Sequence, residues 1–188
     1  MLTQLRQILR TGLVSEEAPV PAPDDVVVAS LQARILSTLG RALTIRHVDA
    51  GSCNGCELEV HALGNPYYNL EGLGIRFVAS PRHADVLLVT GPVSKHMAIA
   101  LQRTYEATPD PKLVVAAGTC ACTGGIFGAS YASLGKLANV IPVNVEIAGC
   151  PPSPTQLLEG ILAAITVAAP PPAAADMATN DQSHAAEP

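Results

Sequence analysis

The chain has 188 residues, which is long enough for one domain with a hydrophobic core and too short for two domains of ordinary size. Apolar residues make up 48% of it and charged residues only 14%, well below the share of about 25% found in typical proteins. We therefore expect other proteins to cover much of its surface. The net charge of −5, the absence of tryptophan and the lack of a dense Lys/Arg block argue against nucleic acid as a partner.

The sequence contains no run of about eighteen apolar residues, so it predicts no transmembrane helix. Its first apolar residues alternate with Gln and Arg, unlike the apolar segment of a secretory signal peptide. We therefore expect the chain to stay in the cytosol, where thiols remain reduced. In that compartment five cysteines, an odd number, indicate metal ligands or redox groups rather than disulfides.

The two ends of the sequence differ from its middle. Residues 1–40 form an expected N-terminal arm, with two amphipathic helices separated by a Pro-rich break at 15–23. The apolar faces of the arm either pack on the chain's own domain or dock on a neighbouring subunit or a membrane surface. Residues 169–188 are rich in Ala and Pro and contain no Leu, Ile or aromatic residue, so we expect a disordered tail.

Between residues 41 and 168, short apolar runs alternate with helical patterns. The expected strands, rich in Val, Leu and Ile, cover 43–48, 75–79, 86–90, 113–117 and 143–147. The expected helices cover 57–63, 95–106, a stretch around 130–137, and 154–167, the last with Ser153 as its N-cap. This alternation predicts an α/β fold with a parallel sheet, and five strands suggest the flavodoxin-like order.

All five cysteines follow the carboxyl ends of expected strands. Cys53 and Cys56 follow the first strand, Cys120 and Cys122 the fourth, and Cys150 the fifth. Open α/β sheets bind their ligands at this edge. The loops there are also rich in glycine, which lets the backbone approach a bulky group closely. The pattern therefore predicts a metal-cluster site.

Thiolates without a neighbouring histidine favour an iron–sulfur cluster or Zn²⁺. One C-x-x-C pair joined by two single cysteines suits a cuboidal cluster better than a structural zinc site, which commonly uses two short-spaced pairs. One of Cys120 and Cys122 is then a spare, and the N–H groups over 51–55 and 118–119 are candidates for hydrogen bonds to cluster sulfur. A zinc site leaves the Gly-rich loops unexplained, and a thioredoxin-like thiol pair leaves Cys120 and Cys150 without a role. Both remain alternatives.

Four motifs occur together in the chain: GSCNGCELEV at 51–60, SPRHADVLLVTG at 80–91, GTC at 118–120 and GCPP at 149–152. They resemble the small-subunit family of membrane-bound, group-4 [NiFe] hydrogenases (the formate hydrogenlyase class), which also includes the 20 kDa B subunit of complex I. The resemblance spans about residues 40–168 and implies a flavodoxin-like domain. It further implies one proximal [4Fe–4S] cluster, with Cys122 on a non-ligand position and with the ligands Cys53, Cys56, Cys120 and Cys150.

The same resemblance implies an electron-transfer subunit that is not catalytic alone and works beside the active site of a large partner subunit. The other implied partners are a ferredoxin-like cluster subunit and integral membrane subunits, which would place the chain peripherally on the cytoplasmic side of the membrane. Asn54 and Gly55 separate the first two cysteines, which are adjacent in complex I, and no second Cys/His-rich domain follows. The split pair favours the hydrogenase side of the family, and the lack of a second cluster-bearing domain favours its group-4, complex I-related class. The alternative is a cluster subunit at the quinone site of a NADH-quinone-oxidoreductase-like complex that lacks Ni–Fe.

Two glutamates, Glu57 and Glu59, follow the second cysteine of the first loop. The related soluble hydrogenases carry a glutamate two residues beyond this cysteine and use it in proton transfer, whereas this chain has Leu58 there. We therefore expect both glutamates to be solvated or cap-like carboxylates at a helix start. The histidines expected to be ordinary surface or core residues are His47, His61 and His96.

Overall fold

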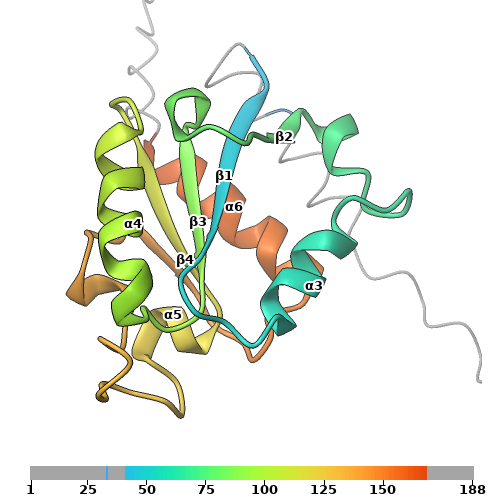
Figure 1. The fold of residues 1–188 in the computed structure, drawn as a ribbon. Coiled ribbons are helices and arrows are strands. Elements are labelled where there is room, and N and C mark those ends of the chain that lie inside the picture. The colour runs from blue at the N-terminus through green and yellow to red at the C-terminus, as the bar shows by residue number, and fades with distance from the viewer. Residues whose placement is uncertain (1–32, 34–40, 169–188) are drawn as a thin grey trace, which may run out of the picture.

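A parallel sheet of five strands forms the centre of the computed structural model, which describes residues 41–168 and Ala33 (Figure 1). The strands are β1 (Leu43–Asp49), β2 (Ile75–Phe77), β3 (Val86–Thr90), β4 (Leu113–Ala117) and β5 (Val145–Ile147). Their order across the sheet is β2-β1-β3-β4-β5. This order confirms the predicted flavodoxin-like topology, in which β2 and β3 lie on opposite sides of β1.

The central strand β3 is buried along its whole length. It pairs in parallel with β1, where Leu88 lies opposite His47, and with β4, where Leu88 lies opposite Val115. A central strand covered on both faces has no solvent side, so its sequence is continuously apolar rather than alternating.

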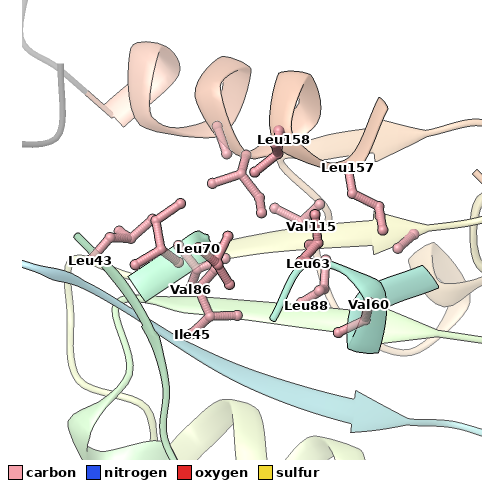
Figure 2. Close-up of a cluster of buried hydrophobic side chains, with 14 of the residues drawn as sticks. Leu43, Ile45, Val60, Leu63, Leu70, Val86, Leu88, Val115, Leu157 and Leu158 are labelled. Atoms are coloured by element: carbon pink, nitrogen blue, oxygen red, sulfur yellow. The ribbon is translucent and has the colours of Figure 1, made fainter. Parts of the chain in front are cut away.

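In the part of the chain that the structure describes from residue 41 on, the faces of the sheet are covered by α3 (Gly55–Ala62), α4 (Lys95–Ala107), α5 (Thr119–Thr123) and α6 (Pro154–Ala168). On one face, α3 and α6 pack on β1, β3 and β4 through a core that includes Leu63, Leu88 and Leu157 (Figure 2). On the other face, Leu101 of α4 packs against Leu87 and its neighbours in the sheet. The turn before α6 contains the predicted N-cap, because the Ser153 hydroxyl accepts the N–H of Gln156 at 3.3 Å.

The helix expected around 130–137 is wrong. This segment is a loop in which the Ser130 hydroxyl accepts the N–H of Ser133 at 3.1 Å, a local bond that competes with helical ones. Gly135, with φ of +81°, lies in a conformation that does not continue a right-handed helix. The elements that we did not predict are α5 and three 3₁₀ turns, η1 (Leu70–Leu73), η2 (Pro81–His83) and η3 (Leu137–Asn139).

The arm expected over 1–40 and the tail expected over 169–188 lie outside the described residues, apart from Ala33, which is helical. Within the described part of the chain, no helix combines the length and the apolar character that crossing a membrane requires.

Candidate metal centre

The three loops that carry the cysteines all leave the sheet at its carboxyl edge. One loop follows β1, one follows β4 and contains α5, and one follows β5 and leads into α6. Figure 1 shows the start of α3, the helix α5 and the turn before α6 gathered at this lower end of the sheet. The parallel topology thus brings together cysteines that lie about a hundred positions apart in the chain.

The first loop is held by the side chain of Asp49, the last residue of β1. One of its carboxylate oxygens accepts the N–H groups of Gly51 and Ser52, both at 2.8 Å. Partial burial acts to raise the pKa of Asp49, but these hydrogen bonds outweigh it, so the pKa lies below the usual carboxyl value. Asn54 then adopts a left-handed conformation (φ +71°) and α3 begins, which leaves Cys53 exposed in the loop.

The second and third loops are joined to each other through Thr119. Its N–H donates to the Gly149 carbonyl at 2.7 Å, and its hydroxyl donates to the same oxygen at 3.0 Å. The N–H of Gly118 also donates to the Ile147 carbonyl at 2.8 Å. These bonds fix Cys120, which follows Thr119, relative to Cys150, which follows Gly149.

The thiols of the three loops are close enough to influence one another electrostatically. Burial, followed by the charges of Glu57 and of the thiols of Cys53, Cys120 and Cys150, raises the pKa of Cys56 to about 11. Burial and the thiols of Cys150 and Cys53 likewise raise the pKa of Cys120. A bound metal centre supplies the positive charge that four neighbouring thiolates require.

Glycines line the thiols where no side chain fits. A Cβ atom on Gly118 would lie 2.6 Å from the Cys56 Sγ, and one on Gly125 would lie 2.7 Å from the Cys120 Sγ. Within the described residues, no three His, Cys, Asp or Glu side chains are grouped closely enough to bind a single ion. The donor set is sulfur alone and glycine lies against two of the sulfur atoms, an arrangement that fits a group bound by thiolates.

The fifth cysteine has other partners. Cys122 is buried in the core on the α4 face, and its thiol donates weak hydrogen bonds to the carbonyls of Ala116 (3.6 Å) and Ile147 (3.5 Å). Burial, with a further contribution from the charge of Glu146, raises its pKa to about 11. A buried thiol of this kind packs as a small core residue.

Most of the N–H groups that we expected to face cluster sulfur have acceptors elsewhere. Those of Gly51 and Ser52 donate to the Asp49 carboxylate, and that of Asn54 donates to the Ser52 hydroxyl. Those of 118 and 119 donate to the carbonyls of Ile147 and Gly149. In the described part of the chain, the N–H groups of Cys53 and Gly55 have no protein acceptor. They are the donors in this first loop that remain for a bound group.

The expectation that Glu57 is solvated or a cap is wrong. The residue is only 7% exposed, no capping bond is formed at the start of α3, and both carboxylate oxygens are buried without a hydrogen-bond partner. The sequence held a signal for this burial, because Glu57, Val60 and Leu63 are spaced by three residues and share the core-facing side of the helix. Glu59, on another side of α3, is half-exposed.

Beside Glu57 lies a cavity of about 520 Å³ between β1, α3 and the chain that follows β2. Its lining includes Arg46, His47, Glu57 and Phe77, and none of the cysteines. The ring of His47 binds the Thr90 hydroxyl at 2.9 Å, and burial lowers its pKa below the usual 6.5. His47 is therefore a partly buried, hydrogen-bonded residue of the sheet, as expected.

The chain matches one family model and is similar in sequence to subunits of known proteins. The family model described as NADH ubiquinone oxidoreductase, 20 Kd subunit, matches residues 53–164, a span that contains all five cysteines. The chain is 42% identical over 147 residues to formate hydrogenlyase subunit 7 of Escherichia coli (strain K12), a match that covers 78% of this chain but only 58% of that protein. It is 44% identical over 133 residues to a probable membrane-bound hydrogenase subunit of Pyrococcus furiosus, covering 71% of this chain and 80% of that protein.

A solved structure resembles the chain as well. A chain of the membrane-bound sulfane sulfur reductase, an archaeal respiratory membrane complex, matches with a TM-score of 0.60 and 35% identity. The match covers 74% of this chain and 75% of that chain.

Proposed function

The chain belongs to the family described as NADH ubiquinone oxidoreductase, 20 Kd subunit, and from this premise we propose that it is an electron-transfer subunit of a membrane-bound, hydrogenase-like oxidoreductase related to complex I. It holds one [4Fe–4S] cluster and relays electrons to or from the active site of a large partner subunit. The cluster ligands are Cys53, Cys56, Cys120 and Cys150. We assign no catalytic residue to the chain itself.

The observation that supports the proposal is that three loops carrying cysteines leave the parallel sheet at the same edge. The thiols of Cys53 and Cys150 contribute to the raised pKa values of Cys56 and Cys120. Gly118 and Gly125 lie against the Cys56 and Cys120 sulfur atoms, where a side chain would collide with them. The donor set contains sulfur alone, which is the ligand chemistry of iron–sulfur clusters.

When bound, such a cluster accepts and releases single electrons, at a potential that its surroundings set. The residues of this chain hold its position: Asp49 fixes the first loop through two N–H groups, and Thr119 ties the second loop to the third. Cys53 and Cys150 are exposed, so this side of the site faces away from the chain's own core. Electron transfer to another subunit therefore proceeds from this side.

Apolar side chains beside the site support a covering partner. In the loop after α5, Ile126 is 94% exposed, Tyr131 is 93% exposed and Phe127 is also exposed. Gly125, whose backbone lies against Cys120, connects this loop to the site. We propose that the large subunit, holding Ni–Fe, covers this apolar loop. A ferredoxin-like cluster subunit and integral membrane subunits complete the complex, on the cytoplasmic side of the membrane.

The second candidate is a cluster subunit at the quinone site of a NADH-quinone-oxidoreductase-like complex that lacks Ni–Fe. It is favoured by the description of the matching family model. The sequence of the large partner decides between the two, because two C-x-x-C pairs of nickel ligands in that partner support the hydrogenase.

The ligand assignment is tested by five single Cys→Ser variants of the full chain, purified without oxygen. We expect the visible absorbance of the cluster to be lost in the Cys53, Cys56, Cys120 and Cys150 variants. The matched control, Cys122→Ser, should retain it, because that thiol points to backbone carbonyls instead. Loss of the cluster in Cys122→Ser, with Cys120→Ser unaffected, would reverse the assignment.

A further inference from the structure

The cavity between β1 and α3 lies against a stretch of β1 that has no partner strand among the described residues. β2 pairs with β1 only as far as Ile45, which lies opposite Phe77, whereas β1 continues to Asp49. The Ile45 carbonyl accepts the N–H of Val78, so the backbone groups of Ile45 face the β2 side. Because this direction alternates along a strand, the backbone groups of His47 face the same side, where its N–H has no acceptor in the described part of the chain.

The same cavity contains buried polar side-chain atoms that have no partner. Among the described residues, these atoms are the Arg46 Nε and both carboxyl oxygens of Glu57, and both residues line the cavity. The Nε–H is a donor, and a carboxyl group has an oxygen that accepts a hydrogen bond in either protonation state. Folded proteins rarely leave such buried groups unpaired. The cavity therefore presents a donor and an acceptor to whatever fills it, whether or not Glu57 is protonated.

The other walls of the cavity are partly apolar. Val60 of α3, Phe77 and Val78 line it, and Phe77 is 38% exposed. An extended polypeptide matches these features together, because its backbone offers both N–H and C=O groups and alternate side chains point to one face. The free edge of β1 favours a peptide over a small molecule, because an added strand satisfies a strand edge with backbone hydrogen bonds.

The cavity borders the side of the chain that carries the cysteines. Asn54, which lies between Cys53 and Cys56 in the first loop, is part of its lining. The large subunit is the partner proposed to cover this side. An extended segment of that subunit reaches the cavity without crossing any other surface of the chain.

We propose that an extended segment of the large partner subunit binds in this cavity and adds to the free edge of β1 at His47. A carbonyl of the segment accepts the Arg46 Nε–H, an N–H of the segment donates to the Glu57 carboxyl group, and an apolar side chain packs on Phe77. Residues 46–49 of β1 rise about 13 Å, which sets the length of the added strand at about four residues. The inference rests on the proposed function for the existence of the large subunit, but it does not require the cluster.

The first test is hydrogen exchange of the full chain, measured alone and in the complex with its large subunit. We expect the His47 N–H to exchange at least about tenfold more slowly in the complex, because it then donates to the added strand. Equal rates in the two samples would overturn the inference. Slow exchange already in the chain alone would overturn it as well, because the chain itself would then fill the cavity.

The second test fills the cavity. Ala79→Trp adds a large side chain at an exposed position of the lining and should weaken binding of the large subunit at least about tenfold. The matched control, Ala100→Trp, adds the same side chain at an exposed position of α4 and should bind normally. Both variants should keep the melting temperature and the iron content of the wild type. Equal binding by the two variants would overturn the inference.

A third comparison removes the unpaired acceptor. Glu57→Leu should make the isolated chain more stable, because no buried polar group is left unpaired, and should weaken binding of the large subunit. Glu57→Gln keeps a carbonyl oxygen as acceptor and should bind within about threefold of the wild type. If Glu57→Leu binds as well as Glu57→Gln, the inference is wrong. Failure of the proposed function differs from all these results, since the wild-type chain would then hold no iron or would not bind a large subunit.

Discussion

Replacing Gly125 with alanine tests whether the loop after α5 must lie against Cys120. Gly125 has φ of +55°, and a Cβ atom there would lie 2.7 Å from the Cys120 Sγ and 3.2 Å from its Cα. The left-handed conformation costs alanine about 1–2 kcal/mol, and the overlap adds about 1–3 kcal/mol because rotation of the thiol leaves the backbone of Cys120 still too close. We expect the free energy of unfolding of the cluster-free chain to fall by about 2–5 kcal/mol. Cluster content should fall as well, because the thiol is displaced.

A matched control exists three residues further along the same loop. Gly128 has φ of +52°, and an added Cβ there would meet nothing within 4 Å. Gly128→Ala should therefore cost only the backbone term, about 1–2 kcal/mol, and leave the iron content unchanged. Urea denaturation followed by circular dichroism gives the two stabilities, and iron analysis gives the cluster content. Equal effects of the two substitutions on both quantities would refute the reasoning.

Three further predictions concern stability. Leu88→Ala, in the fully buried central strand, should lower the free energy of unfolding by about 2–5 kcal/mol, measured by urea denaturation. Asp85→Ala removes the acceptor of the Thr44 N–H (3.0 Å) and hydroxyl (2.7 Å) and should lower the free energy of unfolding by about 1–3 kcal/mol. Arg41→Ala removes only the exposed ion-pair partner of Asp85 and should lower it by less than about 1 kcal/mol. Thermal melting measures both effects. Burial lowers the pKa of His47 in the folded state, so the free energy of unfolding should fall as the pH drops below the unfolded pKa of 6.5 and level off below the folded pKa. In urea titrations at about pH 7.5 and 5.5, His47→Asn should reduce this difference in stability. An unchanged difference would contradict the prediction.

The sheet could be predicted because its buried strands are short, continuously apolar runs. The run at 86–90 is apolar at nearly every position and is bounded by polar loops, so it could only be a strand buried on both faces. The ends of the strands were harder to predict. β5 begins at Val145 rather than at 143. The Asn144 N–H donates to the Val114 carbonyl at 2.9 Å, but the Val114 N–H donates to the Asn144 side-chain Oδ1 at 2.8 Å and not to a backbone carbonyl, so the strand ladder stops there.

Short irregular elements were not predicted, because their sequences are too short or too dependent on local hydrogen bonds to show a regular pattern. The helix α5 has only five residues, TCACT, which is too few to show a helical period, and its N-cap is Gly118, which has a positive φ. The loop over 130–137 contains spaced apolar residues, but side-chain bonds of Ser130 and the backbone of Gly135 prevent a helix.

Convergence of the cysteine loops at one edge followed from the parallel topology alone. The spacing could not decide which of Cys120 and Cys122 faces the site, because both lie in one short helix whose orientation depends on tertiary packing. The spacing of Glu57, Val60 and Leu63 indicated the buried side of α3, but nothing in the sequence indicated that the Glu57 carboxylate has no hydrogen-bond partner.

The most direct test of the central claim is the stoichiometry of metal and sulfide in the full chain purified without oxygen. We predict about four iron atoms and about four acid-labile sulfides per chain, as a single cube bound by four thiolates requires. About one zinc per chain with no sulfide, or thiols that bind no metal at all, would contradict the assignment of a cluster to this edge of the sheet.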